Sequence, residues 1–153
     1  MKKIDSFKII GISTETTNEN NKSAKDLEKL WGQFYSENIS NQISNKISDE
    51  IYSIYTDYKT DYKGKYTSII GLKVNSLDSI PNGLIGREFE SGIYTKFIAK
   101  GEMPNAVIGI WKEIWAKDKE LNRTYTADFE VYGAKSQNGK DSEIEIYIAI
   151  ENE

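Results

Sequence analysis

The sequence predicts an α+β domain in which a curved antiparallel sheet carries two helices on one face. Three observations support this fold class. Segments of strand and helix character follow one another in the order strand, helix, strand, strand, and the order then repeats. Only two segments show the three- and four-residue spacing of apolar side chains that marks an amphipathic helix. The last segment, residues 142–151, alternates isoleucine with other residues, as a strand does.

We expect one domain over residues 1–153, built from two pseudo-repeats at about residues 7–74 and 84–151. A length of 153 residues suits one domain that buries its own core. The two halves share little identity, so the repeat is one of pattern. Residues 38–48 are polar with isolated isoleucines and fit no element. A crevice between two helices over a curved sheet is a common place for a small ligand.

The first half contains one strand, one helix and one hairpin. Residues 7–14 are rich in β-branched side chains, which favour a strand. Residues 24–37 are predicted to be helical, because their apolar side chains recur along one side of a helix. Residues 51–57 and 66–74 have strand character and flank a glycine-containing segment at 62–65, which indicates a hairpin.

The second half repeats this order. A turn at residues 81–83 (Pro-Asn-Gly) precedes two strands, at 84–90 and 92–99. A second helix follows, and its apolar stripe recurs at three- and four-residue steps. The residues of this stripe are Val107, Ile108, Trp111, Ile114 and Trp115. Residues 127–133 and 142–151 then form a second hairpin.

The composition excludes several kinds of site. The chain has no cysteine and no histidine, so it can form no disulfide, no Cys- or His-ligated metal site and no Ser-His-Asp triad. Proton chemistry must therefore use Asp, Glu, Tyr or Lys. We expect no metal and no organic cofactor. The net charge of −4 disfavours direct nucleic-acid binding. No apolar run suggests a membrane span or a signal peptide, so we expect a cytoplasmic protein with no membrane contact.

The segment ADFEVY is the most informative for function. On a strand, Asp128, Glu130 and Tyr132 point to one face. If the second helix lies over that face, Trp111 and Trp115 form an aromatic box with an acid at its floor. Such a box suits a lipophilic cation, because ring faces attract the cation and the carboxylate supplies the counter-charge. A buried glutamate without a ligand would be driven toward its neutral form.

Plainer readings of the same residues stay open. A glutamate on a strand more often faces water, and tryptophans at helical spacing more often belong to the core. Glu145 and Tyr147 form the same type of Glu-x-Tyr pair on the neighbouring strand, so either Glu130 or Glu145 could be the acid of the cleft. When the halves are aligned, Ser53 takes the place of Glu130, which makes Glu130 an acid without a counterpart.

Together these segments resemble the GyrI-like family, the effector-binding domain of bacterial transcription activators. The resemblance rests on the strand FKIIGIST, the helix with Leu27, Leu30 and Trp31, the turn IPNG, and the segments GIYTKFIAKGEMPNAVIGIWKEIW, ADFEVYG and EIEIYIAI. It covers about residues 7–151. It implies a duplicated strand-helix-strand-strand fold with a ligand cleft between the halves.

The resemblance also implies a ligand. In the family, the cleft binds amphipathic, often cationic, aromatic compounds around a buried glutamate, which Glu130 matches by its place in DFEVY. Tyr132, Tyr94 and Trp111 lie in segments that commonly line the cleft. The expected ligand-binding residues are therefore Glu130, Tyr132, Tyr94, Trp111, Trp115 and Tyr147. Relatives that regulate transcription carry a DNA-binding domain; here only residues 1–6 precede the fold, so we expect a free-standing module.

Three functions follow as hypotheses. The first is binding of an amphipathic, cationic aromatic small molecule. The second is hydrolysis of strained electrophilic xenobiotics such as cyclopropanes, similar to some stand-alone relatives. There Glu130 would act on water while Tyr94 or Tyr132 donates to the developing charge. The third is a protein partner, as in an inhibitor that binds gyrase or a regulator. We expect a monomer or a weak dimer.

Overall fold

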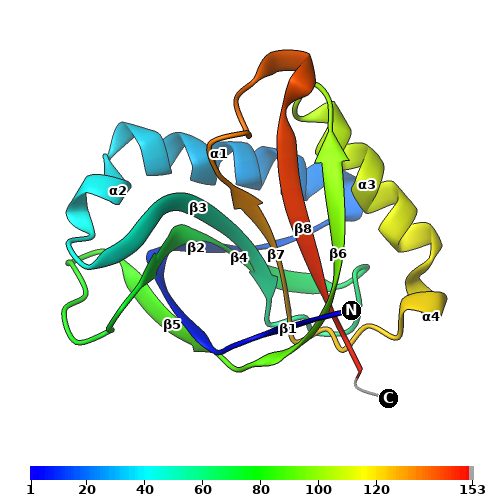
Figure 1. Ribbon diagram of the computed structural model, residues 1–153, viewed down its shortest axis with the longest axis horizontal. Coiled ribbons are helices and arrows are strands. Elements are labelled where there is room, and N and C mark those ends of the chain that lie inside the picture. Colours follow the sequence, from blue (N-terminus) through cyan, green and yellow to red (C-terminus); the bar gives the residue numbers. More distant parts are fainter. Residues whose placement is uncertain (152–153) are drawn as a thin grey trace.

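The computed structural model describes residues 1–151 as one curled, eight-stranded antiparallel sheet with helices on one side (Figure 1). The strands are β1 (Lys2–Ile4), β2 (Phe7–Thr17), β3 (Lys46–Thr56), β4 (Lys65–Val74), β5 (Ile85–Phe89), β6 (Gly92–Lys100), β7 (Ala127–Tyr132) and β8 (Glu143–Ile150). The α-helices are α1 (Lys22–Ser36), α2 (Ile39–Gln42), α3 (Asn105–Ala116) and α4 (Asp118–Leu121). Single 3₁₀ turns lie at Glu19–Asn21 and Gly139–Asp141. The α+β fold class expected from the sequence is confirmed.

The order of the strands is symmetric about the centre of the sheet. The order is β1-β6-β8-β7-β3-β4-β2-β5, and all neighbours are antiparallel. Outward from the central pair, β3-β4-β2 on one side corresponds to β7-β8-β6 on the other. In chain order, each half runs from an outer strand (β2 or β6) through a long helix (α1 or α3) to a hairpin (β3–β4 or β7–β8). The central pair therefore joins the two halves of the chain edge to edge.

The register of this central pair fixes which residues meet at the middle of the sheet. Ser53 on β3 lies directly opposite Glu130 on β7, and Tyr55 lies opposite Asp128. Directly paired residues on neighbouring strands point to the same face. Because side chains alternate along a strand, Tyr132 shares the face of Ser53 and Glu130. Ser53, Tyr55, Asp128, Glu130 and Tyr132 therefore all point to one side of the sheet.

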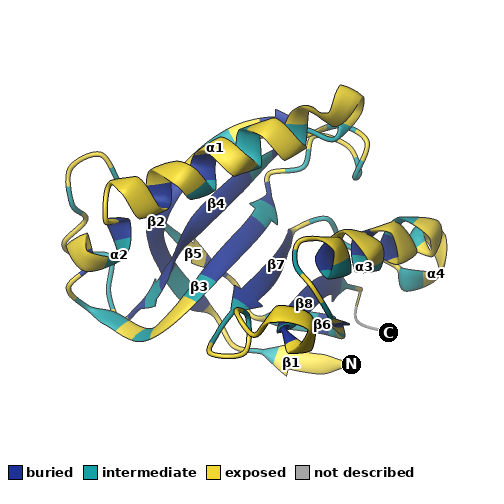
Figure 2. Ribbon diagram, turned by 90° about the horizontal axis from the view of Figure 1, so that it is seen from above, coloured by how far each residue is buried: buried dark blue, intermediate teal, exposed yellow. Residues whose placement is uncertain are grey.

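That side carries both long helices, α1 over the first half and α3 over the second (Figure 2). The apolar stripe of α1 buries Leu30 and Phe34 against isoleucines of β2 and β4. The stripe of α3 buries Val107, Trp111 and Ile114 against β6 and β8. Each helix thus has its own core cluster, which leaves the strip of sheet along β3 and β7 between them. Within residues 1–151, no helix has the length and apolar character needed to cross a membrane.

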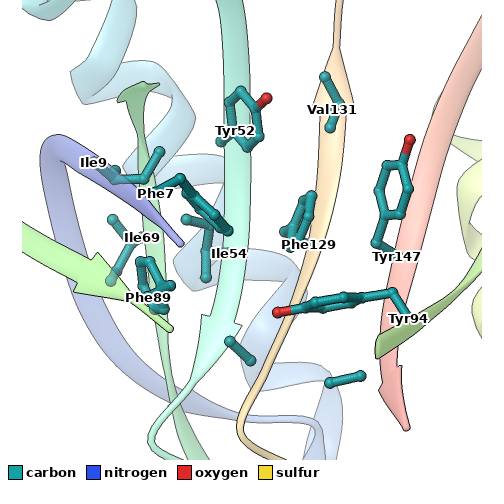
Figure 3. Close-up of a cluster of buried hydrophobic side chains, with 12 residues drawn as sticks. Phe7, Ile9, Tyr52, Ile54, Ile69, Phe89, Tyr94, Phe129, Val131 and Tyr147 are labelled. Atoms are coloured by element: carbon teal, nitrogen blue, oxygen red, sulfur yellow. The ribbon is translucent and has the colours of Figure 1, made fainter. Parts of the chain in front are cut away.

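The opposite side of the sheet is also buried, because the sheet curls over it. Figure 3 shows an aromatic and aliphatic cluster there, drawn from strands of both halves. Phe7 stacks on Phe89 at 5.3 Å between ring centroids, and Phe129 stacks on Tyr147 at 4.9 Å. Both faces of β7 and β8 therefore carry core residues.

The expected elements agree with the structure in kind and differ at their ends. The helix expected at residues 24–37 begins at Lys22. The two expected hairpins are β3–β4 and β7–β8, and both pair as predicted. β1, α2 and α4 were not expected, since each has only three or four residues and too few apolar positions to show a period. The unassigned residues 38–48 hold α2 and the start of β3, whose pairing with β4 is interrupted between Lys46 and Ile51.

Candidate functional site

A cleft of about 550 Å³ lies between α1 and α3 above the central strands. Its walls carry eight aromatic side chains, and both halves of the chain contribute. The first half supplies Trp31, Tyr55, Tyr58, Tyr62 and Tyr66, and the second half supplies Trp111, Trp115 and Tyr132. A volume of this size fits a drug-sized molecule.

Glu130 lies at the floor of the cleft and is only 2% exposed. Its Oε1 accepts a hydrogen bond of 2.6 Å from the Tyr132 hydroxyl. Its Oε2 accepts one of 2.6 Å from Trp111 Nε1 and one of 3.0 Å from the Tyr55 hydroxyl. All three donors are neutral. Among residues 1–151, Glu130 takes part in no ion pair.

This environment sets the protonation of the site. Burial raises the pKa of the Glu130 carboxyl above its usual value, and the three hydrogen bonds oppose that rise. Burial and the neighbouring Glu130 also raise the pKa of Tyr55 and of Tyr132 well above the usual value. Both tyrosines therefore stay protonated and act as donors. The carboxyl group is held in place by hydrogen bonds but has no positive partner among residues 1–151.

The tryptophans of the two helices pack across the boundary between the halves. Trp31 on α1 meets the ring of Tyr132 on β7 edge-on, at 5.0 Å between centroids. Trp111 on α3 meets the ring of Tyr55 on β3 in the same way, at 5.4 Å. These two contacts place an aromatic pair on each side of Glu130. The aromatic pairs of the two walls are thus related by the symmetry of the sheet. Glu130 is not, because its counterpart in the first half is Ser53.

A second buried acid near the cleft has a positive partner. Asp128 is 0% exposed and accepts from Arg123 at 2.7 Å, from the Tyr58 hydroxyl at 2.7 Å and from the Ala149 backbone N–H at 2.9 Å. Arg123 also pairs with Asp118 at 3.1 Å. Asp128 therefore has a structural ion-pair role, and Glu130 is the buried carboxyl whose charge would be left unbalanced.

The structure brings four of the expected site residues together. Glu130, Tyr132, Trp111 and Trp115 all line the cleft. No group of three or more acidic side chains within residues 1–151 is arranged to hold a metal ion.

Two residues expected in the cleft, Tyr94 and Tyr147, lie elsewhere, so that expectation was wrong. Tyr94 and Tyr147 belong to the buried cluster on the opposite side of the sheet (Figure 3). Tyr147 is paired with Phe129, not with Glu130, and so shares the face of Phe129. A Glu130–Tyr94 pair for hydrolysis is therefore not formed. Glu145 also faces away from the cleft, where it pairs with Lys96 at 2.8 Å.

The first half contributes site residues that were not expected from the sequence. Tyr55 donates to Glu130, and Trp31 packs on Tyr132, yet neither was expected in the site. When Ser53 is aligned with Glu130, Tyr55 takes the place of Tyr132. A tyrosine at that position occupies an equivalent place across a symmetric sheet, so the repeat held the signal for Tyr55. Tyr58, Tyr62 and Tyr66, in and around the first hairpin, complete that side of the cleft.

Comparison with known proteins gives relatives of the same fold. An integron cassette protein from the mobile metagenome of Vibrio cholerae is 28% identical, with a TM-score of 0.75 over 98% of this chain and 94% of that one. A structure of SAV2435 bound to tetraphenylphosphonium is 18% identical, with a TM-score of 0.82 over 99% of this chain and 92% of that one. This second likeness shows the fold.

A curated relative is YobU of Bacillus subtilis (strain 168), named as a candidate transcriptional regulator protein. It is 32% identical over 88 residues, and the match spans 57% of this chain and 55% of YobU. The family match is broader, since it covers residues 1–150. It confirms the expected kinship with effector-binding domains: the chain belongs to Cass2, the family of integron-associated effector binding proteins.

Proposed function

We propose that the cleft binds an amphipathic, aromatic organic cation and that Glu130 is its counter-charge. One observation carries this proposal. Glu130 is a buried carboxyl with three neutral donors, no ion pair within residues 1–151 and aromatic rings around it. An unpaired buried charge is costly, so a ligand that brings a positive charge to this position gains more than a neutral one.

The aromatic walls would add affinity of two kinds. Burial of the ligand's apolar surface contributes roughly 25 cal/mol per Å² removed from water. A cation over the face of Trp or Tyr gains roughly 0.5–2 kcal/mol per contact, depending on desolvation. Trp111 and Tyr55 combine both, since each lines the cleft and donates to Glu130. Shape selection by such rings is loose, whereas the buried acid Glu130 selects for charge.

Binding should also change the protonation of the acid. Burial favours the neutral form of Glu130 in the free protein. An adjacent cation favours the ionised form, so its arrival lowers the pKa of the carboxyl. At a pH at which Glu130 is protonated in the free protein, binding of the cation then releases a proton. The affinity for the cation therefore rises with pH.

The relatives support the choice of ligand class. The solved structure of SAV2435, which shares the fold, is described as bound to tetraphenylphosphonium, an aromatic cation. YobU is named as a candidate transcriptional regulator, and the family is named for effector binding. We propose that the ligand acts here too as an effector that signals the presence of such a compound.

The test is a titration of tryptophan fluorescence with two ions of matched shape. Tetraphenylphosphonium and tetraphenylborate carry four phenyl groups each and opposite charges. Trp31, Trp111 and Trp115 report on the cleft without a label. The wild type is expected to bind the cation at least about tenfold more tightly than the anion, which corresponds to about 1.4 kcal/mol.

Two variants assign the selectivity to one acid. Glu130→Gln should remove most of the preference for the cation. Glu145→Gln is the matched control, because it changes the same Glu-x-Tyr pattern on the opposite side of the sheet and should leave the preference intact. Equal binding of cation and anion by the wild type, or an unchanged preference in Glu130→Gln, would overturn the proposal.

A further inference from the structure

A second hollow, of about 450 Å³, lies at one end of the buried aromatic cluster, on the side of the sheet opposite the cleft. We call it the basal hollow. It opens where β3 and β8 end and where β6 and β7 begin, beside β5. Four members of the buried cluster line it, namely Phe89, Tyr94, Ala127 and Ala149. Two of the four are alanines, which leaves room at this end of the cluster for a small ligand.

The hydroxyl of Tyr94 is a polar group without a partner at this hollow. Tyr94 is 3% exposed, and its ring meets Phe129 edge-on at 5.4 Å between centroids. Most tyrosine hydroxyls of the chain donate a hydrogen bond, whereas that of Tyr94 has no partner within residues 1–151. It is not one of the fully buried polar atoms that lack a partner there, so it is open to the hollow that Tyr94 lines. Figure 3 shows this hydroxyl pointing across the cluster, toward the side where Phe89 lies.

This hydroxyl favours a ligand that carries a hydroxyl of its own. A buried polar group without a hydrogen bond is unfavourable, so a bound group that pairs with it gains affinity. Burial and the neighbouring Asp128 raise the pKa of Tyr94 to about 12, so its hydroxyl stays protonated at neutral pH. A phenolic hydroxyl both donates and accepts. A hydroxyl on the ligand can therefore pair with it in either direction.

The charges around the basal hollow favour a neutral ligand. At its rim, Arg87 donates to both carboxylate oxygens of Asp57, at 2.9 and 3.1 Å. Glu88 precedes the inward-pointing Phe89 on β5, so it points to the outer side, where it pairs with Lys8 at 4.0 Å. None of the charged side chains in this lining, all within residues 1–151, is buried. The hollow therefore has no buried charge that would select for a cation or an anion.

From this arrangement we propose that the basal hollow is a second ligand site, which binds a neutral aromatic compound with a hydroxyl group. The ring of the ligand lies among Phe89, Ala127 and Ala149, and its hydroxyl pairs with that of Tyr94. Within residues 1–151, the linings of the cleft and of the basal hollow share only Tyr58. The inference is therefore independent of the function proposed for the cleft.

The test compares 2-naphthol with naphthalene, which has the same two rings and no hydroxyl. Equilibrium dialysis measures each probe in the presence of excess tetraphenylphosphonium, which competes for the cleft and leaves the basal hollow free. The wild type is expected to bind 2-naphthol about fivefold more tightly than naphthalene, which is the gain from one neutral hydrogen bond.

Variants assign this preference to one hydroxyl. Tyr94→Phe keeps the ring, so the preference for 2-naphthol should fall close to one while naphthalene binds as before. Tyr52→Phe is the matched control and should keep the preference. Tyr52 belongs to the same cluster, and its hydroxyl also has no partner within residues 1–151, but it does not line the basal hollow.

A third variant tests the hollow itself. Ala149→Val narrows the basal hollow and should weaken the binding of both probes at least about threefold. Urea unfolding checks that each variant folds. Tyr94→Phe loses no hydrogen bond within residues 1–151, so its free energy of unfolding should be no lower than that of the wild type.

Each outcome decides for or against the basal site. A wild type that binds neither probe, or both equally, overturns the proposal. Binding that Ala149→Val leaves unchanged, a preference that survives in Tyr94→Phe, or a loss that is equal in Tyr52→Phe also overturns it. Loss of the preference in Tyr94→Phe and not in Tyr52→Phe supports the site. The charge selectivity of the cleft is measured separately with the two tetraphenyl ions, so either proposal can fail alone.

Discussion

Ser53 and Glu130 lie directly opposite each other at the centre of the sheet, and Tyr55 joins them through hydrogen bonds. The Ser53 hydroxyl donates to the Tyr55 hydroxyl at 3.3 Å, which in turn donates to Glu130 Oε2 at 3.0 Å. A carboxylate at position 53 would face Glu130 at about 5 Å, and two like charges at that distance oppose ionisation of both. Serine at position 53 therefore leaves Glu130 as the one acid of this central pair, oriented by its hydrogen bonds.

We predict that Glu130→Gln stabilises the ligand-free protein at pH 7. Burial raises the pKa of Glu130 in the folded state above its unfolded value, so the folded state holds this proton more tightly. Stability is then highest below the unfolded pKa and falls as pH rises toward the folded pKa. Each pKa unit corresponds to about 1.4 kcal/mol. Glutamine does not ionise, so the variant does not lose this part of the free energy of unfolding at pH 7.

Urea unfolding at pH 7 and at pH 4 measures this effect. The gain in the free energy of unfolding should be large at pH 7 and small at pH 4. Glu145→Gln should behave in the opposite way, because hydrogen bonding to Lys96 lowers the pKa of Glu145 and its charged form stabilises the fold at neutral pH. A destabilised Glu130→Gln at pH 7 would show that the buried carboxyl contributes to folding rather than to binding.

The two tyrosines that flank the acid are predicted to differ in importance. Tyr132 is the sole donor to Oε1 within residues 1–151, whereas Oε2 keeps Trp111 when Tyr55 is removed. A hydrogen bond to a charged group contributes about 1.5–3 kcal/mol. Tyr132→Phe should therefore raise the pKa of Glu130 more than Tyr55→Phe, and weaken binding of tetraphenylphosphonium about tenfold or more at pH 7.

Fluorescence titrations between pH 6 and pH 9 distinguish this cause from lost packing. Both variants keep the aromatic ring, so the contact with the cation remains. Binding to Tyr132→Phe should recover as pH rises and Glu130 ionises, with Tyr55→Phe closer to the wild type throughout. A loss that is equal in both variants and independent of pH would contradict the role of these hydrogen bonds.

The sequence predicted the acid of the site through the period of one strand. In ADFEVY, alternation alone places Glu130 and Tyr132 on one face, and the structure agrees. The second helix likewise follows from the spacing of Trp111 and Trp115, and both line the cleft. These inferences needed only local geometry, because a strand and a helix fix which side chains share a side.

Residues on other strands could not be placed in this way. Tyr147 also alternates, but alternation does not say which face of β8 the helices cover. A sheet with one wet face would have left Tyr147 either in the cleft or in water. The curled sheet instead buries both faces, and the pairing of Tyr147 with Phe129 places it in the second core. That choice depends on register between strands, which a single sequence does not contain.

The ion pair beneath one end of the cleft is predicted to be important for stability. The side chains of Asp128 and Arg123 are 0% and 1% exposed, and they lie 2.7 Å apart. Removal of one partner leaves a buried charge unpaired, which costs about 3–5 kcal/mol. Asp128→Asn should cost about 3 kcal/mol, at the lower end, because Arg123 keeps Asp118 at 3.1 Å.

Urea unfolding at pH 7 gives this cost directly. The surface pair of Lys96 and Glu145 offers the control, since its side chains are 34% and 42% exposed. Exposed pairs contribute about 0–1 kcal/mol, so Glu145→Gln should change the free energy of unfolding by no more than that. Similar losses in the two variants would mean that water reaches Arg123 once Asp128 is replaced.

Access to the cleft is predicted to depend on a stack between its two halves. Tyr62, in the loop between β3 and β4, stacks on Trp115 of α3 at 5.8 Å, with 11° between the rings. The Asn18 side chain holds this loop through a hydrogen bond of 3.0 Å to the Tyr62 carbonyl oxygen. A ligand that enters at this end must part the two rings. Tyr62→Ala removes the stack but leaves Glu130 and its donors in place.

Stopped-flow fluorescence with tetraphenylphosphonium tests this dependence. Association and dissociation should both become faster in Tyr62→Ala, and dissociation should change more because the variant also loses one aromatic contact, worth roughly 0.5–1 kcal/mol. The dissociation constant should rise no more than about fivefold. Lys59→Ala, at an exposed position of the same loop that does not line the cleft, should leave both rates near those of the wild type. Unchanged rates in Tyr62→Ala would place the entrance at the other end of the cleft, beside Trp31 and Pro104, which also line an adjoining hollow.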